Sequence, residues 1–162
     1  MDGLPVNASL DDLIDPPCVE DILEASSLVV RLAGKGPEQA YIALAQMIRN
    51  RCCVARSHMR ACGRVHPNFG NGSWAAACGL QRLNAGMGRV QLSRAQLRAI
   101  SSLCRVAAGE EEDPTCGATL CHRHDEEPPW ASSVVATALI GDLVFYAARS
   151  AADFPDQIHA RS

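Results

Sequence analysis

Four side chains that can bind a metal ion fall close together in the second half of the chain: Cys116, Cys121, His122 and His124. Zinc is held by about four such side chains in a tetrahedron. The spacing C-x4-C-H-x-H matches no common zinc motif, and in a β-strand Cys121 and His122 would point to opposite faces. We therefore favour a disulfide with surface histidines at this place. A zinc site stays open as the alternative, and no other metal or cofactor is expected.

Cysteine is frequent along the whole chain, with eight residues among 162. An even number permits a set of disulfides whose connectivity cannot be read from sequence. Disulfides need an oxidising compartment, yet residues 1–15 contain four aspartates, no basic residue and no apolar segment, so a secretion signal is not predicted. Two interpretations remain: buried unpaired thiols, or a disulfide from Cys116 or Cys121 that joins the loop-rich region to the helices.

Several classes of protein are disfavoured by composition and motifs. The net charge is −3 and basic residues do not cluster, so electrostatic binding to nucleic acid is not expected. No apolar run approaches the roughly 18 residues of a membrane span. The chain also lacks a nucleophile elbow, a phosphate-binding P-loop and a cysteine protease signature.

The first two helices are predicted from apolar residues at intervals of three and four. Asp15 is expected to cap the first helix, with two prolines in its first turn, and Gly34 to end it. Pro37 is expected to start a longer helix that ends at Gly63 and forms the centre of the core. The predicted apolar faces are Ile22, Ala25, Val29 and Leu32 in the first helix, and Tyr41, Leu44, Ile48, Cys52, Ala55, Met59 and Cys62 in the second.

The middle of the chain predicts a loop and two further helical segments. Residues 66–73 (HPNFGNGS) have the composition of a loop, and a short helix is expected over 74–83. Ser93 and Gln96 form a capping-box pattern at the start of a third clear helix, which Gly109 should end. The predicted apolar face of that helix is Leu97, Ile100, Cys104 and Ala107.

The last third of the chain changes to short β-prone segments at 118–122, 134–139 and 143–146. These predict an antiparallel hairpin or a three-stranded sheet. The fold class is therefore expected to be α+β and mainly α. We expect a single domain over residues 16–148, preceded by an N-terminal arm (1–15) and followed by a polar C-terminal tail (149–162).

Two groups of motifs go beyond composition. They are M-I-R-N-R at 47–51, and then D-P-T-C-G-A-T at 113–119, P-P-W-A at 128–131, I-G at 140–141 and V-F-Y at 144–146. In this order and spacing they resemble the SleB-like cell wall hydrolases, a lysozyme-like family that cuts the glycan strands of peptidoglycan. The resemblance spans roughly residues 22–147. It implies a lysozyme-like helical domain with a small C-terminal antiparallel β-hairpin or sheet.

The resemblance also implies a glutamic acid that protonates the glycosidic oxygen from an apolar, partly closed cleft. In the family this residue belongs to a G-E-A-R-G-E element, and here its position is Leu32, while the second glutamate falls on Gly36. Residues 81–84 replace the family's Q-F-S cleft motif, Leu143 its last histidine, and Cys116 a glycine. Loss of a general acid costs about 10²–10⁴-fold in rate. The resemblance therefore predicts a scaffold that has lost its chemistry.

Three residues near these motifs are candidates for what function is left. Glu38 is a first-turn glutamate well placed at a helix N-terminus or, in the alternative, a relocated catalytic acid. Trp74 and Trp130 could stack on sugar rings as substrate-binding residues, although a lone tryptophan is more often a core anchor.

The function predicted from this resemblance is that of a catalytically degenerate, cell-wall-hydrolase-like protein that serves as a structural component of a bacteriophage tail or baseplate. Such a protein would be assembled in the host cytoplasm into the virion, which agrees with the absence of a predicted secretion signal. The expected partners are other virion or tail proteins, with peptidoglycan as a further candidate. The alternative is an active peptidoglycan glycosidase, a muramidase or lytic transglycosylase, used in cell entry or lysis. Whether the protein is an enzyme stays open.

Overall fold

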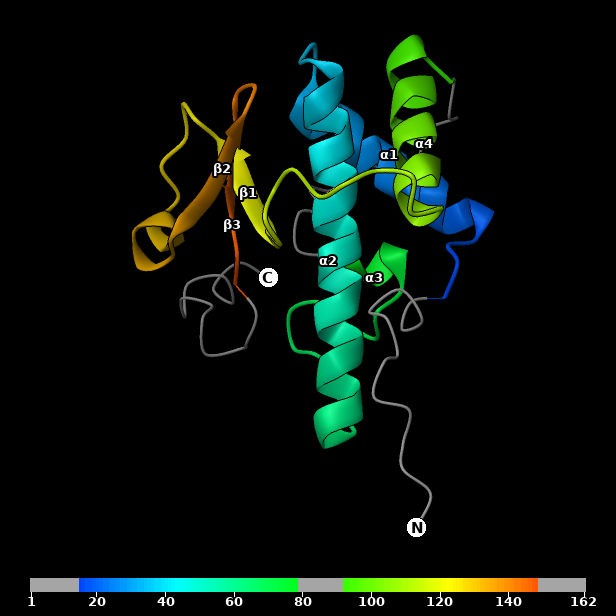
Figure 1. Cartoon of the computed structure of the whole chain (residues 1–162), viewed down its shortest axis with the longest axis vertical. Coiled ribbons are helices and arrows are strands. Elements are labelled where there is room, and N and C mark those ends of the chain that lie inside the picture. Colours follow the sequence, from blue (N-terminus) through cyan, green and yellow to red (C-terminus); the bar gives the residue numbers. More distant parts are fainter. Residues whose placement is uncertain (1–14, 79–91, 149–162) are drawn as a thin grey trace.

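The structure, a computed structural model, describes residues 15–78 and 92–148 of the chain. Figure 1 shows a long central helix with other helices on one side and a small sheet on the other. In chain order the elements are α1 (Val19–Ala33), α2 (Glu38–Cys62), α3 (Trp74–Cys78), α4 (Arg94–Ala107), β1 (Leu120–Arg123), the 3-10 helix η3 (Pro129–Ser133), β2 (Ala136–Ile140) and β3 (Leu143–Tyr146). The predicted fold class, α+β and mainly α, is confirmed.

Helix α1 begins later than predicted. Its N-cap is Cys18, whose backbone N–H donates to the Asp21 carboxylate at 3.1 Å. Asp15, predicted as the cap, instead forms an ion pair with Arg56 on α2. A residue before proline is pushed out of the helical region, so two successive prolines delay the start of the helix. The predicted end is confirmed, because Gly34 is the C-cap with a φ of 54°.

Helix α2 has the predicted bounds and the predicted central place. It starts after Pro37 and ends at Gly63, which has the left-handed φ of 70°. Every residue from 40 to 48 is buried, because helices pack on one side and the sheet on the other. The prediction is wrong at the last turn: Cys62 is exposed, since the C-terminal end of α2 extends beyond the sheet and α4 (Figure 1).

Helix α4 has the predicted capping box but buries a different face. Gln96 N–H donates to Ser93 Oγ at 3.2 Å, and Ser93 N–H donates back to the Gln96 side chain at 3.3 Å. The buried residues are Ala99, Ser102, Leu103 and Val106. The predicted face is therefore rotated by one residue, and Leu97 is 53% exposed. Small residues on the buried side allow α4 to pack closely against α1 and α2.

Helix α3 can be compared with its prediction only at its start. The helix begins at Trp74 as expected. The predicted continuation over 79–83, the segment 81–84, residues 1–14 of the arm and the whole tail 149–162 lie outside the described residues. None of the described helices is long and apolar enough to cross a membrane.

The sheet is antiparallel with the order β1-β3-β2, so β3 is central. Leu120 pairs with Tyr146 across β1 and β3, and Ile140 pairs with Leu143 across β2 and β3, with a bulge between Ala136 and Ala138. The predicted strands are confirmed with bounds shifted by up to two residues. Leu143 and Phe145 of β3 belong to the same core as the inner face of α2, whereas Tyr146 belongs to a second, smaller cluster.

Candidate functional site

The two motif groups that stand out in the sequence are in direct contact. From α2, Asn50 donates through Nδ2 to Asp113 Oδ2 at 2.9 Å and to the backbone oxygen of Ala118 at 3.0 Å. The next residue, Arg51, donates from Nε to the backbone oxygen of Thr119 at 2.5 Å. The N-R element of the helix therefore holds the D-P-T-C-G-A-T turn that leads into β1.

The carboxylate of Asp113 accepts several hydrogen bonds from this turn. Its Oδ1 accepts from the backbone N–H of Thr115 at 2.8 Å and from Thr115 Oγ1 at 2.6 Å, and its Oδ2 accepts from Gly117 N–H at 2.8 Å. Partial burial acts to raise the pKa of Asp113, but the hydrogen bonds from Thr115, Asn50 and Gly117 outweigh it, and the net pKa is lowered. Asp113 is therefore an ionised structural acceptor and not a proton donor.

Arg51 is buried without a carboxylate partner in the described part of the chain. Besides Thr119 it donates from Nη1 to the backbone oxygen of Ala77 at 2.9 Å, and its guanidinium lies 5.6 Å from the ring centre of Phe69. A buried charge is costly unless such contacts replace water. Arg51 thus ties α2 to α3 and to the start of β1.

Leu32, at the position where the resemblance to the SleB-like hydrolases places a catalytic acid, packs against the main core and is half-buried. Glu38 lies in the first turn of α2 with a side chain that is 66% exposed, and it accepts from Arg105 at 2.9 Å. A general acid needs an apolar, partly closed setting to hold its proton. The surface position of Glu38 favours the first-turn interpretation, and the catalytic alternative stays a prediction.

The two tryptophans have different surroundings. Trp74 is only 2% exposed and belongs to the main core, which matches the core interpretation. Trp130 is half-buried and lies edge-on to His122 and Tyr146, with ring centres 5.6 and 5.4 Å away. It belongs to an aromatic group that was not predicted. The register pairs Leu120 with Tyr146, so His122 and Tyr146 are diagonal neighbours on adjacent strands.

The four candidate zinc ligands do not converge. Cys121 is buried in the core, whereas His122 lies on the other face of β1. Both His122 nitrogens have partners: Nδ1 lies 2.7 Å from the backbone oxygen of Arg123 and Nε2 lies 2.8 Å from Tyr146 Oη. Cys116 is exposed in the turn, and His124 is exposed beside Asp142, 3.8 Å away. The zinc alternative is not supported by these residues, which do not form a metal-binding group, and neither Cys116 nor Cys121 forms a disulfide in the structure.

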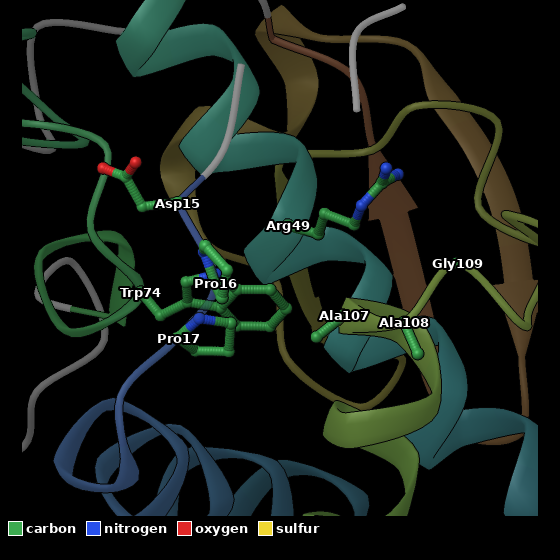
Figure 2. A pocket seen from close by; sticks show the side chains of 8 residues that line it. All are labelled: Asp15, Pro16, Pro17, Arg49, Trp74, Ala107, Ala108 and Gly109. Carbon is green, nitrogen blue, oxygen red and sulfur yellow. The ribbon is translucent and has the colours of Figure 1, made fainter. Parts of the chain in front are cut away.

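A pocket of about 420 Å³ opens at the other side of α2 from the sheet (Figure 2). It is lined by residues 15–17 before α1, Arg49 of α2, Trp74 of α3 and residues 107–109 at the end of α4. Neither Leu32 nor Glu38 lines it. Figure 2 shows the Asp15 carboxylate and the Arg49 guanidinium on opposite sides. The pocket therefore lacks the converging polar groups of a typical small-molecule site.

Comparisons with known proteins place the helical part of the chain in a family. No curated protein and no solved structure matches the chain. A family model described as "Domain of unknown function (DUF7742)" matches residues 18–100, which contain α1, α2, α3 and the first half of α4. The matched residues are about half of the chain, and the protein therefore belongs to the DUF7742 family.

Proposed function

We propose that this protein is a cell-wall-hydrolase-like domain of the lysozyme type that no longer cleaves glycan and works as a structural component of a bacteriophage tail or baseplate. The observation that carries the proposal is the contrast between the motif contacts and the acid position. Asn50 and Asp113 keep the contact that joins the two motif groups, while the acid position holds Leu32, packed against the core. A chain that keeps its scaffold and has an apolar residue in place of its acid is suited to binding.

The edge strand β2 supports contact with other proteins. Strand β2 is at the edge and carries no charged residue, and Leu139 on it is 68% exposed, with the neighbouring Val135 82% exposed. Soluble proteins usually protect an edge strand with charges or proline, because its backbone groups can pair with another strand. We assign this edge to an extended segment of a neighbouring tail subunit.

A peptidoglycan zymogram tests the loss of catalysis. Full-length protein should give no clearing band under conditions in which an active lysozyme clears the gel. Clearing by the wild-type protein that is lost in Glu38→Gln would overturn the proposal and establish the relocated acid.

Fractionation of purified virions tests the structural role. The protein should sediment with particles, and Leu139→Lys should reduce its amount in them, because a charge would be placed on the docking edge. Val19→Lys is the matched control, since Val19 is also 70% exposed but lies at the start of α1. A protein found only free in the lysate would contradict the tail assignment.

A further inference from the structure

The last turn of α2 carries two metal-ligating side chains on one face, His58 and Cys62. Residues four apart are neighbours on a helix surface, and here His58 Nε2 lies 3.3 Å from Cys62 Sγ. In a tetrahedral zinc site with Zn–N of about 2.0–2.1 Å and Zn–S of about 2.3 Å, the two donor atoms are roughly 3.5 Å apart. The pair therefore already has close to the separation that a bound ion requires.

The ring of His58 is held in place by a second histidine. The ring centres of His58 and His66 are 4.9 Å apart in an edge-to-face arrangement. His66 is itself fixed, because its Nδ1 accepts from the backbone N–H groups of Asn68 and Phe69, each at 3.1 Å, and its ring stacks on Phe69. The fixed ring of His66 therefore packs against the ring of His58.

The pair is also accessible to a cation, and it lies at the C-terminal end of the helix, where a positive charge is favoured. Cys62 is exposed and His58 is partly exposed. Helix α2 ends at Cys62, where the last carbonyl groups form the negative end of the helix dipole. One of these, the backbone oxygen of His58, lies 3.2 Å from Cys62 Sγ and accepts from the thiol.

We propose that His58 and Cys62 form an open site for a divalent transition-metal ion of the zinc class. An imidazole nitrogen with a thiolate sulfur favours Zn²⁺ and Co²⁺ over Mg²⁺ and Ca²⁺, which prefer oxygen. No third histidine, cysteine or carboxylate joins them among residues 15–78 and 92–148. Water or a donor from another molecule fills the remaining positions. This inference does not depend on the proposed tail function.

Titration with Co²⁺ tests the site, because cobalt bound to a thiolate gives a charge-transfer absorption band. Reduced, metal-free full-length protein should develop this band with a single equivalent of Co²⁺, and Zn²⁺ but not Mg²⁺ should remove it. His58→Ala and Cys62→Ser should each weaken Co²⁺ binding by at least about tenfold, since loss of even an outer-shell partner costs roughly 10–100-fold.

Cys104→Ser is the matched control, because Cys104 is another exposed helical cysteine. It should leave both the band and the affinity unchanged. Circular dichroism of each variant checks that the helices are intact. The proposal is overturned if the wild-type protein gives no thiolate band, if the band persists in Cys62→Ser, or if Cys104→Ser removes it equally.

Discussion

Asn50 on α2 and Asp113 in the turn before β1 are 63 residues apart in sequence and are joined by a hydrogen bond of 2.9 Å. The same amide of Asn50 also donates to the backbone oxygen of Ala118. One side chain of the central helix therefore satisfies two acceptors of the segment that starts the sheet. This contact couples the helical and β parts of the fold.

Replacing Asn50 by Ala should weaken the contact between the helical and the β parts and destabilise the fold. The substitution removes one donor from each of two partly buried acceptors, so we expect the free energy of unfolding to fall by about 1–3 kcal/mol. Chemical denaturation measures the change. Asn71→Ala is the control, because Asn71 accepts only one local hydrogen bond in an exposed loop, from Ser73 N–H. Equal losses in the two variants would contradict the coupling role of Asn50.

Asp113 should make stability depend on acid pH. Its folded pKa lies below its ordinary value, so its contribution is present above the unfolded pKa of about 3.9 and is lost as pH falls through the folded pKa. Thermal unfolding between about pH 6 and pH 3 should therefore show a smaller loss of stability for Asp113→Asn than for the wild type. Asp125→Asn removes an exposed carboxylate and should keep the wild-type slope.

Cys116 is in the left-handed region of the backbone, with a φ of 57°. A side chain costs roughly 1–2 kcal/mol in this conformation, and glycine avoids the cost. We expect Cys116→Gly to raise the free energy of unfolding by up to about 1 kcal/mol, since the greater freedom of glycine in the unfolded chain offsets part of the gain. Cys104→Gly in helix α4 should have the opposite sign. Destabilisation by both variants would show that the turn is not strained.

The thiols should differ sharply in reactivity. Burial raises the pKa of Cys78 to about 12 and also raises the pKa of Cys52, so neither forms much thiolate at neutral pH. In native protein, alkylation should label Cys18, Cys62, Cys104 and Cys116 first and leave Cys52, Cys78 and Cys121 protected until unfolding. Mass spectrometry reads out the labelled positions. Fewer than eight labels after denaturation without reductant would reveal a disulfide.

The ends of α1 and α2, the start of α4 and the fold class could be predicted because their signals are local. Gly34 and Gly63 end helices through positive φ, and Ser93 with Gln96 caps α4 within four residues. The buried face of α4 could not be predicted, because it depends on which small residues meet α1 and α2. Hydrophobicity alone favoured Leu97 over Ala99.

The candidate site was predictable only in part, because its contacts also depend on tertiary packing. The motifs that contain Asn50 and Asp113 stand out in the sequence, but their contact depends on the tertiary fold. Strand alternation correctly separated Cys121 from His122, whereas the burial of Trp74 required the packing of α3 on α1 and α2. The four-residue spacing of His58 and Cys62 was a usable signal, since both residues fall within the predicted helix.

Placing a glutamate at position 32, where the resemblance to the SleB-like hydrolases puts a catalytic acid, should not create catalysis. Leu32 packs against the core, so Leu32→Glu replaces an apolar contact by a carboxyl group and should lower the free energy of unfolding by about 2 kcal/mol or more. Chemical denaturation measures this loss. A peptidoglycan zymogram measures activity, which we expect to be absent because Leu143 stands where the resemblance to the SleB-like hydrolases places a histidine. Leu97→Glu on the exposed side of α4 is the matched control and should change stability by no more than about 0.5 kcal/mol. A Leu32→Glu variant that is as stable as the wild type and clears peptidoglycan would mean that the cleft is intact and that only the acid has been lost.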